Sequence, residues 1–243
     1  MIETIIRQIK NLIQVSSGHD VPNGSKHYAG KYLDGKAHYY YDENVDGRIY
    51  EGSFYYLGKY LYPPYGTATD YVSGTYLHNC KHGRWKFHHK RRGVRKLLYV
   101  DYFEGRHNGI YRYKSSGNRK RNGDDTTLVI EMSDGHPCGS VTGNFSGEIL
   151  TGLCDSDGRP DGTWTIDLSK TNLCRMEYEK WEHGSLVEAY SEDLTTGKRT
   201  YNTTSSILPF LRNFIHYDCL PLERLITKGS ISWRGNFAIK ESM

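Results

Sequence analysis

The chain lacks most of the features that mark secreted, membrane and metal-binding proteins. Its five cysteines are odd in number and scattered, with no Cys-x-x-Cys pair, so no zinc ribbon or disulfide framework is encoded. No apolar run approaches the roughly 18 residues of a membrane span, and no secretory signal is present. We therefore expect free thiols in a reducing compartment, a cytoplasmic location and no transmembrane segment.

Catalytic motifs are missing as well. There is no Gly-x-Ser-x-Gly elbow, no phosphate-binding glycine loop before a helix and no His-Glu-x-x-His. Residues 42–47 match the first half of a calcium loop, but the twelfth position, which should supply a glutamate, is Ser53. We predict no catalytic residue, no cofactor and no metal. An uncharacterised hydrolase stays open as an alternative, because carboxylate pairs such as Glu177 and Glu179, or Asp101 and Glu104, could act together.

Glycine and tyrosine, by contrast, are abundant, at 26 and 21 residues. They form a recurring Gly-x-aromatic motif, and its successive aromatic positions are 28, 25, 26, 53 and 26 residues apart. We interpret the interval of 53 as two periods with a degenerate copy of the motif near residue 135. A fixed period of this length is the signature of a repeat architecture. The predicted aromatic repeat face comprises Tyr32, Tyr60, Trp85, Tyr102, Tyr111, Trp164, Trp181 and Tyr190.

Short aromatic runs bounded by Gly, Asp and Asn are typical of strands joined by tight turns. Trp85 and Phe87 alternate with charged neighbours, so one face of the strand is aromatic and the other is charged. Tyrosine outnumbers phenylalanine three to one, which suits a thin sheet whose rings are half covered. We predict a mainly β fold, a single elongated antiparallel meander of stacked β-hairpin repeats over residues 28–201.

Apolar residues at helical spacing predict one helix at each end of this array. Residues 1–16 are expected to form an N-terminal amphipathic helix, and residues 205–243 a C-terminal helical cap followed by a final strand. Pro221 is expected to end the C-terminal helix. Because a terminal hairpin exposes an unpaired edge, we expect both helices to cap the open ends of the array.

Two stretches resemble known repeat families. Tyr50-Glu51-Gly52-Ser53-Phe54, followed by Gly58, resembles the start of a MORN repeat. The units from Gly74-Thr75-Tyr76 through His82-Gly83-Arg84-Trp85 to Tyr102-Phe103-Glu104-Gly105 resemble the related YwqK-type antitoxin repeat, and the resemblance extends over residues 28–201. It implies a β-hairpin array that binds proteins or, in some members, membranes, and for YwqK-type relatives a toxin-neutralising role. It implies no catalytic residues.

Charge is distributed unevenly along the chain. Residues 78–121 contain fourteen Lys or Arg against two acids, and residues 122–195 contain fifteen acids against four Lys or Arg. Histidines and Cys80 between residues 78 and 89 could converge on a metal, but the surrounding positive charge disfavours a dication. The candidates for anion binding are Arg84, Lys86, Lys90, Arg91, Arg92, Arg95 and Lys96.

Two classes of function follow from this charge pattern. The first is a non-catalytic scaffold for protein–protein interaction, either antitoxin-like through its acidic segment or self-associating through complementary segments. The second is binding of nucleic acid or an anionic membrane surface through the basic aromatic strip at residues 78–121.

Overall fold

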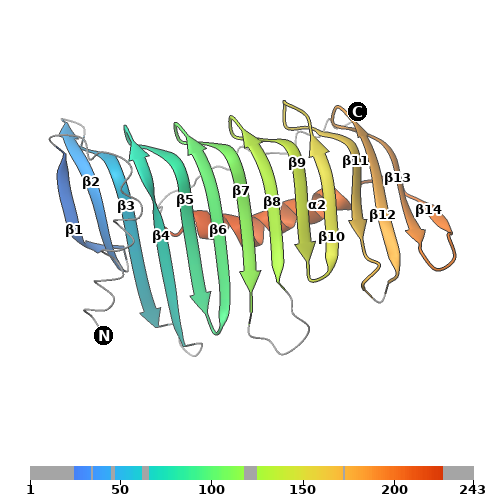
Figure 1. The fold of residues 1–243 in the computed structure, drawn as a ribbon, viewed down its shortest axis with the longest axis horizontal. Coiled ribbons are helices and arrows are strands. Elements are labelled where there is room, and N and C mark those ends of the chain that lie inside the picture. The colour runs from blue at the N-terminus through green and yellow to red at the C-terminus, as the bar shows by residue number, and fades with distance from the viewer. Residues whose placement is uncertain are drawn as a thin grey trace.

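The computed structural model describes residues 25–33, 35–44, 47–61, 66–117, 125–171 and 173–226. They contain one antiparallel sheet of 14 strands in which each strand pairs with its neighbours in sequence (Figure 1). This open meander confirms the mainly β prediction. The strands are β1 (Lys26–Tyr32), β2 (Gly35–Asn44), β3 (Gly47–Leu61), β4 (Thr67–Leu77), β5 (Cys80–Arg91), β6 (Val94–Phe103), β7 (Arg106–Ser116), β8 (Thr126–Ser133), β9 (His136–Phe145), β10 (Glu148–Cys154), β11 (Pro160–Asp167), β12 (Arg175–Glu182), β13 (Ser185–Asp193) and β14 (Arg199–Tyr201).

One face of the sheet is apolar and buried. Cross-strand partners line up in a rank that runs over five strands, and every side chain in this rank is fully buried. A second rank lies beside it, so large rings and aliphatic chains cover this face continuously. The first rank consists of Trp85, Val100, Tyr111, Ile130 and Val141, and the second of Phe87, Leu98, Tyr113 and Leu128.

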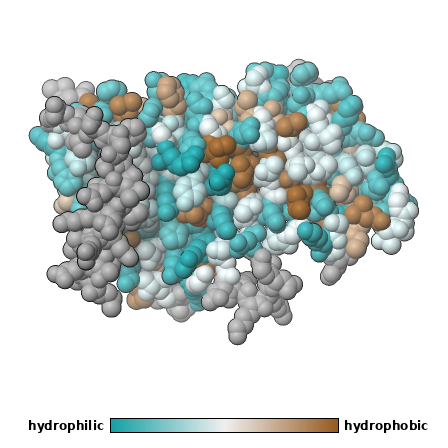
Figure 2. Space-filling view, viewed as in Figure 1, coloured by the Kyte–Doolittle hydropathy of each residue, from teal (hydrophilic) through white to brown (hydrophobic). Residues whose placement is uncertain are grey.

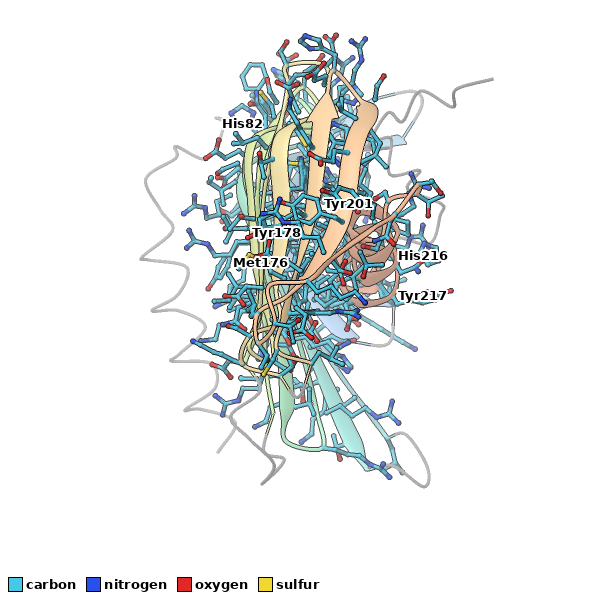
Figure 3. All side chains as sticks on the ribbon, turned by 90° about the vertical axis from the view of Figure 1, so that its right-hand side faces the viewer. His82, Met176, Tyr178, Tyr201, His216 and Tyr217 are labelled. Carbon is cyan, nitrogen blue, oxygen red and sulfur yellow. The ribbon has the colours of Figure 1, made fainter. Side chains whose placement is uncertain are left out.

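Among the described residues, one helical segment covers part of this face. It consists of α2 (Ile207–Phe214), the π-helical turn η1 (Ile215–Cys219) and α3 (Leu220–Glu223), and it crosses behind the strands in Figure 1. Phe214 lies against Tyr113 and Phe145, with ring centroids 5.2 Å and 4.7 Å apart. We call the covered side the helix face and the opposite side the outer face; the two are seen edge-on in Figure 3, where Met176 and Tyr178 lie on the outer side and His216 and Tyr217 on the helix.

The C-terminal helix was predicted correctly, but its position was not. It covers a face of the sheet rather than an open end, because a single-layer sheet with an apolar face needs cover along its length. Pro221 does not end the helix; the wider π turn precedes it and accommodates the missing N–H. The predicted N-terminal helix at residues 1–16 and the final strand near residues 231–237 lie outside the described residues.

The C-terminal edge of the sheet is protected by other means. β14 has only three residues, all of them exposed. The pairing of β12 with β13 contains a register shift after Lys180, which distorts the neighbouring strand. Short edge strands and bulges are devices that discourage edge-to-edge association, so the described chain needs no helix at this end.

Two glycines frame each of the core tryptophans Trp85 and Trp164. Gly83 has a φ of 65° and lies within the bulge of β5, where the pairing with β4 passes from Ser73–Lys86 to Thr75–His82, so it provides the backbone bend that sends Trp85 to the helix face. Gly74, on the facing strand, lies directly under the indole, where an added Cβ would come within 2.1 Å of the ring. The indole N–H donates to the Thr75 carbonyl at 3.0 Å. The same arrangement recurs around Trp164, with Gly162, Gly152 and the Leu153 carbonyl.

This arrangement recurs at Trp85 and Trp164, but elsewhere the bends lie at positions that differ from the predicted Gly-x-aromatic spacing. In β3 the bend is at Gly52, with a φ of 71°, so Phe54 and not Tyr60 corresponds to Trp85. In β9 it is at Gly139, which makes Val141 the counterpart and not residues near 135. Glycine and tyrosine are so common in this chain that spacing alone selected some of the wrong pairs.

Candidate polyanion-binding interface

The structure divides the predicted basic block between the two faces. Strict alternation along β5 directs Arg84, Lys86 and Lys90 to the outer face, and Arg95 joins them from β6. Arg91 and Lys96 belong to the helix face instead, where Lys96 binds Asp218 of η1 at 2.6 Å. Arg92 occupies the β5–β6 turn with a φ of 49°. Four of the seven candidates thus share one solvent-facing surface.

Two further cations complete this surface, and the sequence interpretation did not single them out. Arg112 lies directly opposite Tyr99, and Lys114 lies opposite Leu97, both on β7. Only the cross-strand register brings them beside β5 and β6. We define the basic platform as Lys86, Lys90, Arg95, Arg112 and Lys114 on the outer face of β5–β7.

Most of the platform carries charge that the fold does not neutralise. Lys90 and Arg95 are exposed and directly opposite each other, a pairing of like charges that destabilises a sheet. Within the described residues, Lys86, Lys90, Arg95 and Arg112 form no ion pair, and Lys114 has a carboxylate 3.2 Å away in Asp125. Arg84, by contrast, makes a bidentate contact with Asp101, so we leave it out of the platform.

The positive charge of the platform affects the pKa of a histidine at its centre. His88 lies between Lys86 and Lys90 on the outer face of β5, opposite Tyr71 and Leu97. Partial burial lowers its pKa, and the neighbouring charges of Lys86 and Arg95 lower it further. The imidazole is therefore held towards its neutral form in the free protein.

Tyrosine rings are interleaved with these cations. The ammonium of Lys86 lies 5.5 Å from the ring centre of Tyr71 and 5.9 Å from that of Tyr99. Tyr71 also meets Tyr55 edge-on, at 5.0 Å between ring centres. Figure 2 views this outer face, where hydrophilic residues surround a small apolar group near the middle of the molecule. Rings and cations alternate across neighbouring strands here.

The predicted aromatic repeat face is mostly core. Five of its members are buried on the helix face, and Tyr32 is half-buried beside Ile226, to whose carbonyl its hydroxyl donates at 3.4 Å. Tyr190 belongs to the outer face, because Ala189 occupies the core position of that copy. The side chain of Tyr60 lies outside the description. The five buried members are Trp85, Tyr102, Tyr111, Trp164 and Trp181.

Carboxylates of the acidic segment largely serve the fold. Hydrogen bonds from Ser140 lower the pKa of Glu131, and those from Thr196 and Thr195 lower the pKa of Asp193. Glu177 pairs with Arg175 at 2.9 Å and, like Glu179, is buried. Further carboxylates are held by Arg106 on Asp134, by Arg199 on Glu192 and by the backbone N–H groups of Asp157 and Arg159 on Asp155.

A separate group of ionisable residues is buried under α3. One oxygen of Glu223 accepts hydrogen bonds from Tyr102 and His107, at 2.5 Å and 2.6 Å. Burial raises the pKa of Glu223, but His107 and Lys81 outweigh it, and the net pKa lies below its ordinary value. The Lys81 ammonium lies 5.0–5.2 Å from three ring centres, those of Trp85, Phe87 and Tyr102. These contacts fasten the helix to the sheet.

The other candidate groups named from the sequence are occupied by contacts within the described residues or are dispersed there. Among the described residues, no three His, Cys, Asp or Glu side chains are grouped as a metal would require. The five cysteines are free. Of the two carboxylate pairs named as alternatives, Asp101 is held by Arg84, and Glu179 is hydrogen-bonded to the start of α2. The described helices are too short and polar to cross a bilayer.

Comparison of the sequence with protein-family models and with curated proteins finds no match. The resemblance to MORN and YwqK-type repeats therefore remains a prediction, and functional inference depends on the geometry of the outer face.

Proposed function

We propose that this protein is a non-catalytic repeat scaffold that binds an anionic macromolecule through the basic platform on its outer face. The observation that carries the proposal is the unneutralised charge on one side of a rigid sheet. Lys90 and Arg95 oppose each other there, and Arg112 lies one strand further on. Holding like charges together costs stability, and a bound polyanion offsets that cost.

The alternative, in which the acidic segment binds a basic partner, has less support. An antitoxin-like or self-associating scaffold would need free carboxylates in the acidic segment to receive a basic partner. Glu131, Asp155 and Asp193 instead accept hydrogen bonds within turns and bulges, and Glu179 is buried beneath the helix. These carboxylates already have hydrogen-bond partners within the chain, whereas Lys90 and Arg95 of the platform form no ion pair with a described residue.

The architecture suits such binding. The helix and the two buried ranks hold the backbone of β5–β7 in place, so the platform cations project from a preorganised surface. Their field should speed association with a polyanion, and affinity should fall steeply with salt because condensed counterions are released on binding.

Heparin affinity chromatography with two matched charge reversals tests the proposal. Lys90→Glu combined with Arg112→Glu alters two exposed platform residues, whereas Lys180→Glu combined with Lys198→Glu alters two exposed basic residues elsewhere, with the same change in net charge. We expect the platform variant to elute at a much lower salt concentration than the wild type and the control variant to elute close to it. Equal losses in the two variants, or a wild type that is not retained, would contradict the proposal.

A further inference from the structure

We infer that the partner of the basic platform is a single-stranded nucleic acid whose bases stack on Tyr71 and Tyr99. This inference rests on the proposed function and names the ligand. Positive charge alone would attract any polyanion, but tyrosine rings lie between these cations and add a surface for stacking.

The two rings are placed at a spacing that a flexible strand can follow. Tyr71 is on β4 and Tyr99 on β6, so two strand separations, about 10 Å, lie between them. Both side chains are half-buried, which fixes the rings at the surface without hiding them. Bases stacked on such rings contribute about 1–3 kcal/mol each in single-strand binding proteins.

Cations flank each ring on the neighbouring strands. Lys86 lies between the two rings, and Arg112 is directly beyond Tyr99 in the same rank. Lys90 and Arg95 lie nearer the β5–β6 turn, in a parallel rank. A single strand presents phosphates and base faces alternately, and this arrangement of ring and cation matches that alternation.

A duplex fits this surface less well. Its base faces are stacked inside the helix, so only its phosphates can meet a nearly flat sheet, and Tyr71 and Tyr99 would contribute nothing. The platform is part of the face of a 14-stranded sheet, whereas the elements that enter a major groove are a helix or a two-stranded ribbon. We therefore expect a preference for single strands.

A lipid surface is also disfavoured by where the apolar side chains lie. Stable binding to an anionic membrane combines basic residues with apolar groups that insert beside them. The exposed large apolar residues of β4–β6 are Leu77, next to the β4–β5 turn, and Phe103, at the end of β6. Leu77 and Phe103 lie at the opposite end of β5 and β6 from Lys90 and Arg95. The more exposed Leu61, on β3, is separated from β5 by β4.

Fluorescence anisotropy with a labelled 12-nucleotide oligo(dT) tests the inference. The variants are Tyr71→Ala with Tyr99→Ala, the conservative Tyr71→Phe with Tyr99→Phe, and the control Tyr178→Ala with Tyr190→Ala. The control removes a stacked pair, 4.8 Å between ring centres, from the same face outside the platform. We expect the platform alanine variant to bind at least tenfold more weakly, and the phenylalanine and control variants to bind as the wild type does.

The remaining arms separate the inference from the proposed function. The same oligonucleotide annealed to its complement should bind several-fold more weakly than the single strand at equal salt. Equal binding of the duplex, or unchanged binding by the platform alanine variant while heparin retention still depends on Lys90 and Arg112, would overturn base recognition and leave polyanion binding in place. Binding to phosphatidylserine vesicles or to an acidic protein, without binding to oligo(dT), would also overturn it. If the wild type bound neither heparin nor the oligonucleotide, both proposals would be refuted.

Discussion

At the residue scale, two glycines matter for the space they leave rather than for their flexibility. Gly74 and Gly152 lie beneath the indoles of Trp85 and Trp164, and a methyl group at either position would overlap the ring. Each tryptophan can therefore lie flat on its neighbouring strand and donate its N–H to a carbonyl there. This contact is the structural unit that repeats.

Replacing Gly74 with alanine tests this packing. The added Cβ would lie 2.1 Å from the Trp85 ring, so the indole must leave its position, and we expect a loss of about 3 kcal/mol in the free energy of unfolding. Gly117→Ala is the control, because the nearest atom to its added Cβ is 3.6 Å away. Urea denaturation followed by tryptophan fluorescence measures both. A Gly74→Ala protein as stable as Gly117→Ala would mean that the indole tolerates the displacement.

His88 provides a second prediction at this scale. Burial and neighbouring cations lower its pKa in the free protein, and a bound polyanion would counter that field and raise the pKa. Binding should therefore take up a proton, and affinity should increase as the pH falls from 7.5 to 5.5. We expect His88→Gln to lose most of this pH dependence in heparin or oligonucleotide binding, whereas His183→Gln, an exposed histidine far from the platform, should keep it. The same slope in all three proteins would exclude His88 as the linked group.

At the element scale, the helix is held to the sheet by carboxylates at both of its ends. Glu179, on β12, accepts hydrogen bonds from the N–H groups of Ser206 and Ile207, at 2.6 Å and 2.9 Å. It therefore caps α2 from another element, since the N-cap Ser206 makes no side-chain cap of its own. Glu223 performs the corresponding attachment at the far end through Tyr102 and His107.

Removing the Glu179 cap should loosen the start of the helix. Glu179→Ala leaves buried N–H groups without an acceptor, and we expect a loss of about 3 kcal/mol in the free energy of unfolding. Glu188→Ala, on the exposed edge of β13, should change it by less than about 0.5 kcal/mol. Thermal or urea unfolding measures the difference, and equal stabilities would show that the cap contributes nothing.

Glu223 predicts how the helix responds to acid. Its folded pKa lies below the ordinary value of 4.5, so the ionised carboxylate stabilises the fold above pH 4.5, and this contribution disappears as the pH falls towards the folded pKa. Between pH 6 and pH 3 the wild type should therefore lose more stability than Glu223→Gln, which has no proton to gain. Urea midpoints across this range test the prediction, and parallel curves for the two proteins would contradict it.

At the scale of the whole molecule, the sheet is a single layer that the helix covers over only part of its length. Strands β6–β9 include the buried ranks and the Phe214 contacts, whereas β13 and β14 are largely exposed. In such arrays each strand depends mainly on its neighbours, so stability should vary along the axis.

Hydrogen exchange should reveal this gradient. We expect amides of β13 and β14 to exchange at least a hundredfold faster than those of β6–β9, because they have fewer buried contacts to break before opening. Peptide-resolved mass spectrometry measures both regions in one sample. Uniform protection along the sheet would mean that the whole array opens as one cooperative unit.

Residue patterns in the sequence predicted much of this fold and part of the basic platform. Alternation around Trp85 and Phe87 predicted the two faces of β5, and helical spacing after Ser205 predicted the C-terminal helix. The Gly-x-aromatic spacing predicted the wrong core position at Tyr60 and Tyr190. A bend at Gly52, or near Val187, moves the core position along the strand. Arg112 and Lys114 belong to the basic strip at residues 78–121 but were not named as candidates, because only the register of β6 with β7 shows that they lie beside Tyr99 and Leu97.

The sequence by itself determined the strands, their turns and the excess of basic residues in the middle of the chain, because these follow from side-chain alternation and local backbone preference. Only the tertiary structure decided which of those residues act together. Register between strands brought Arg112 beside Tyr99 and turned Lys96 towards the helix, and hydrogen bonding engaged the carboxylates of the acidic segment. Such pairings depend on contacts between distant residues, which local pattern does not encode.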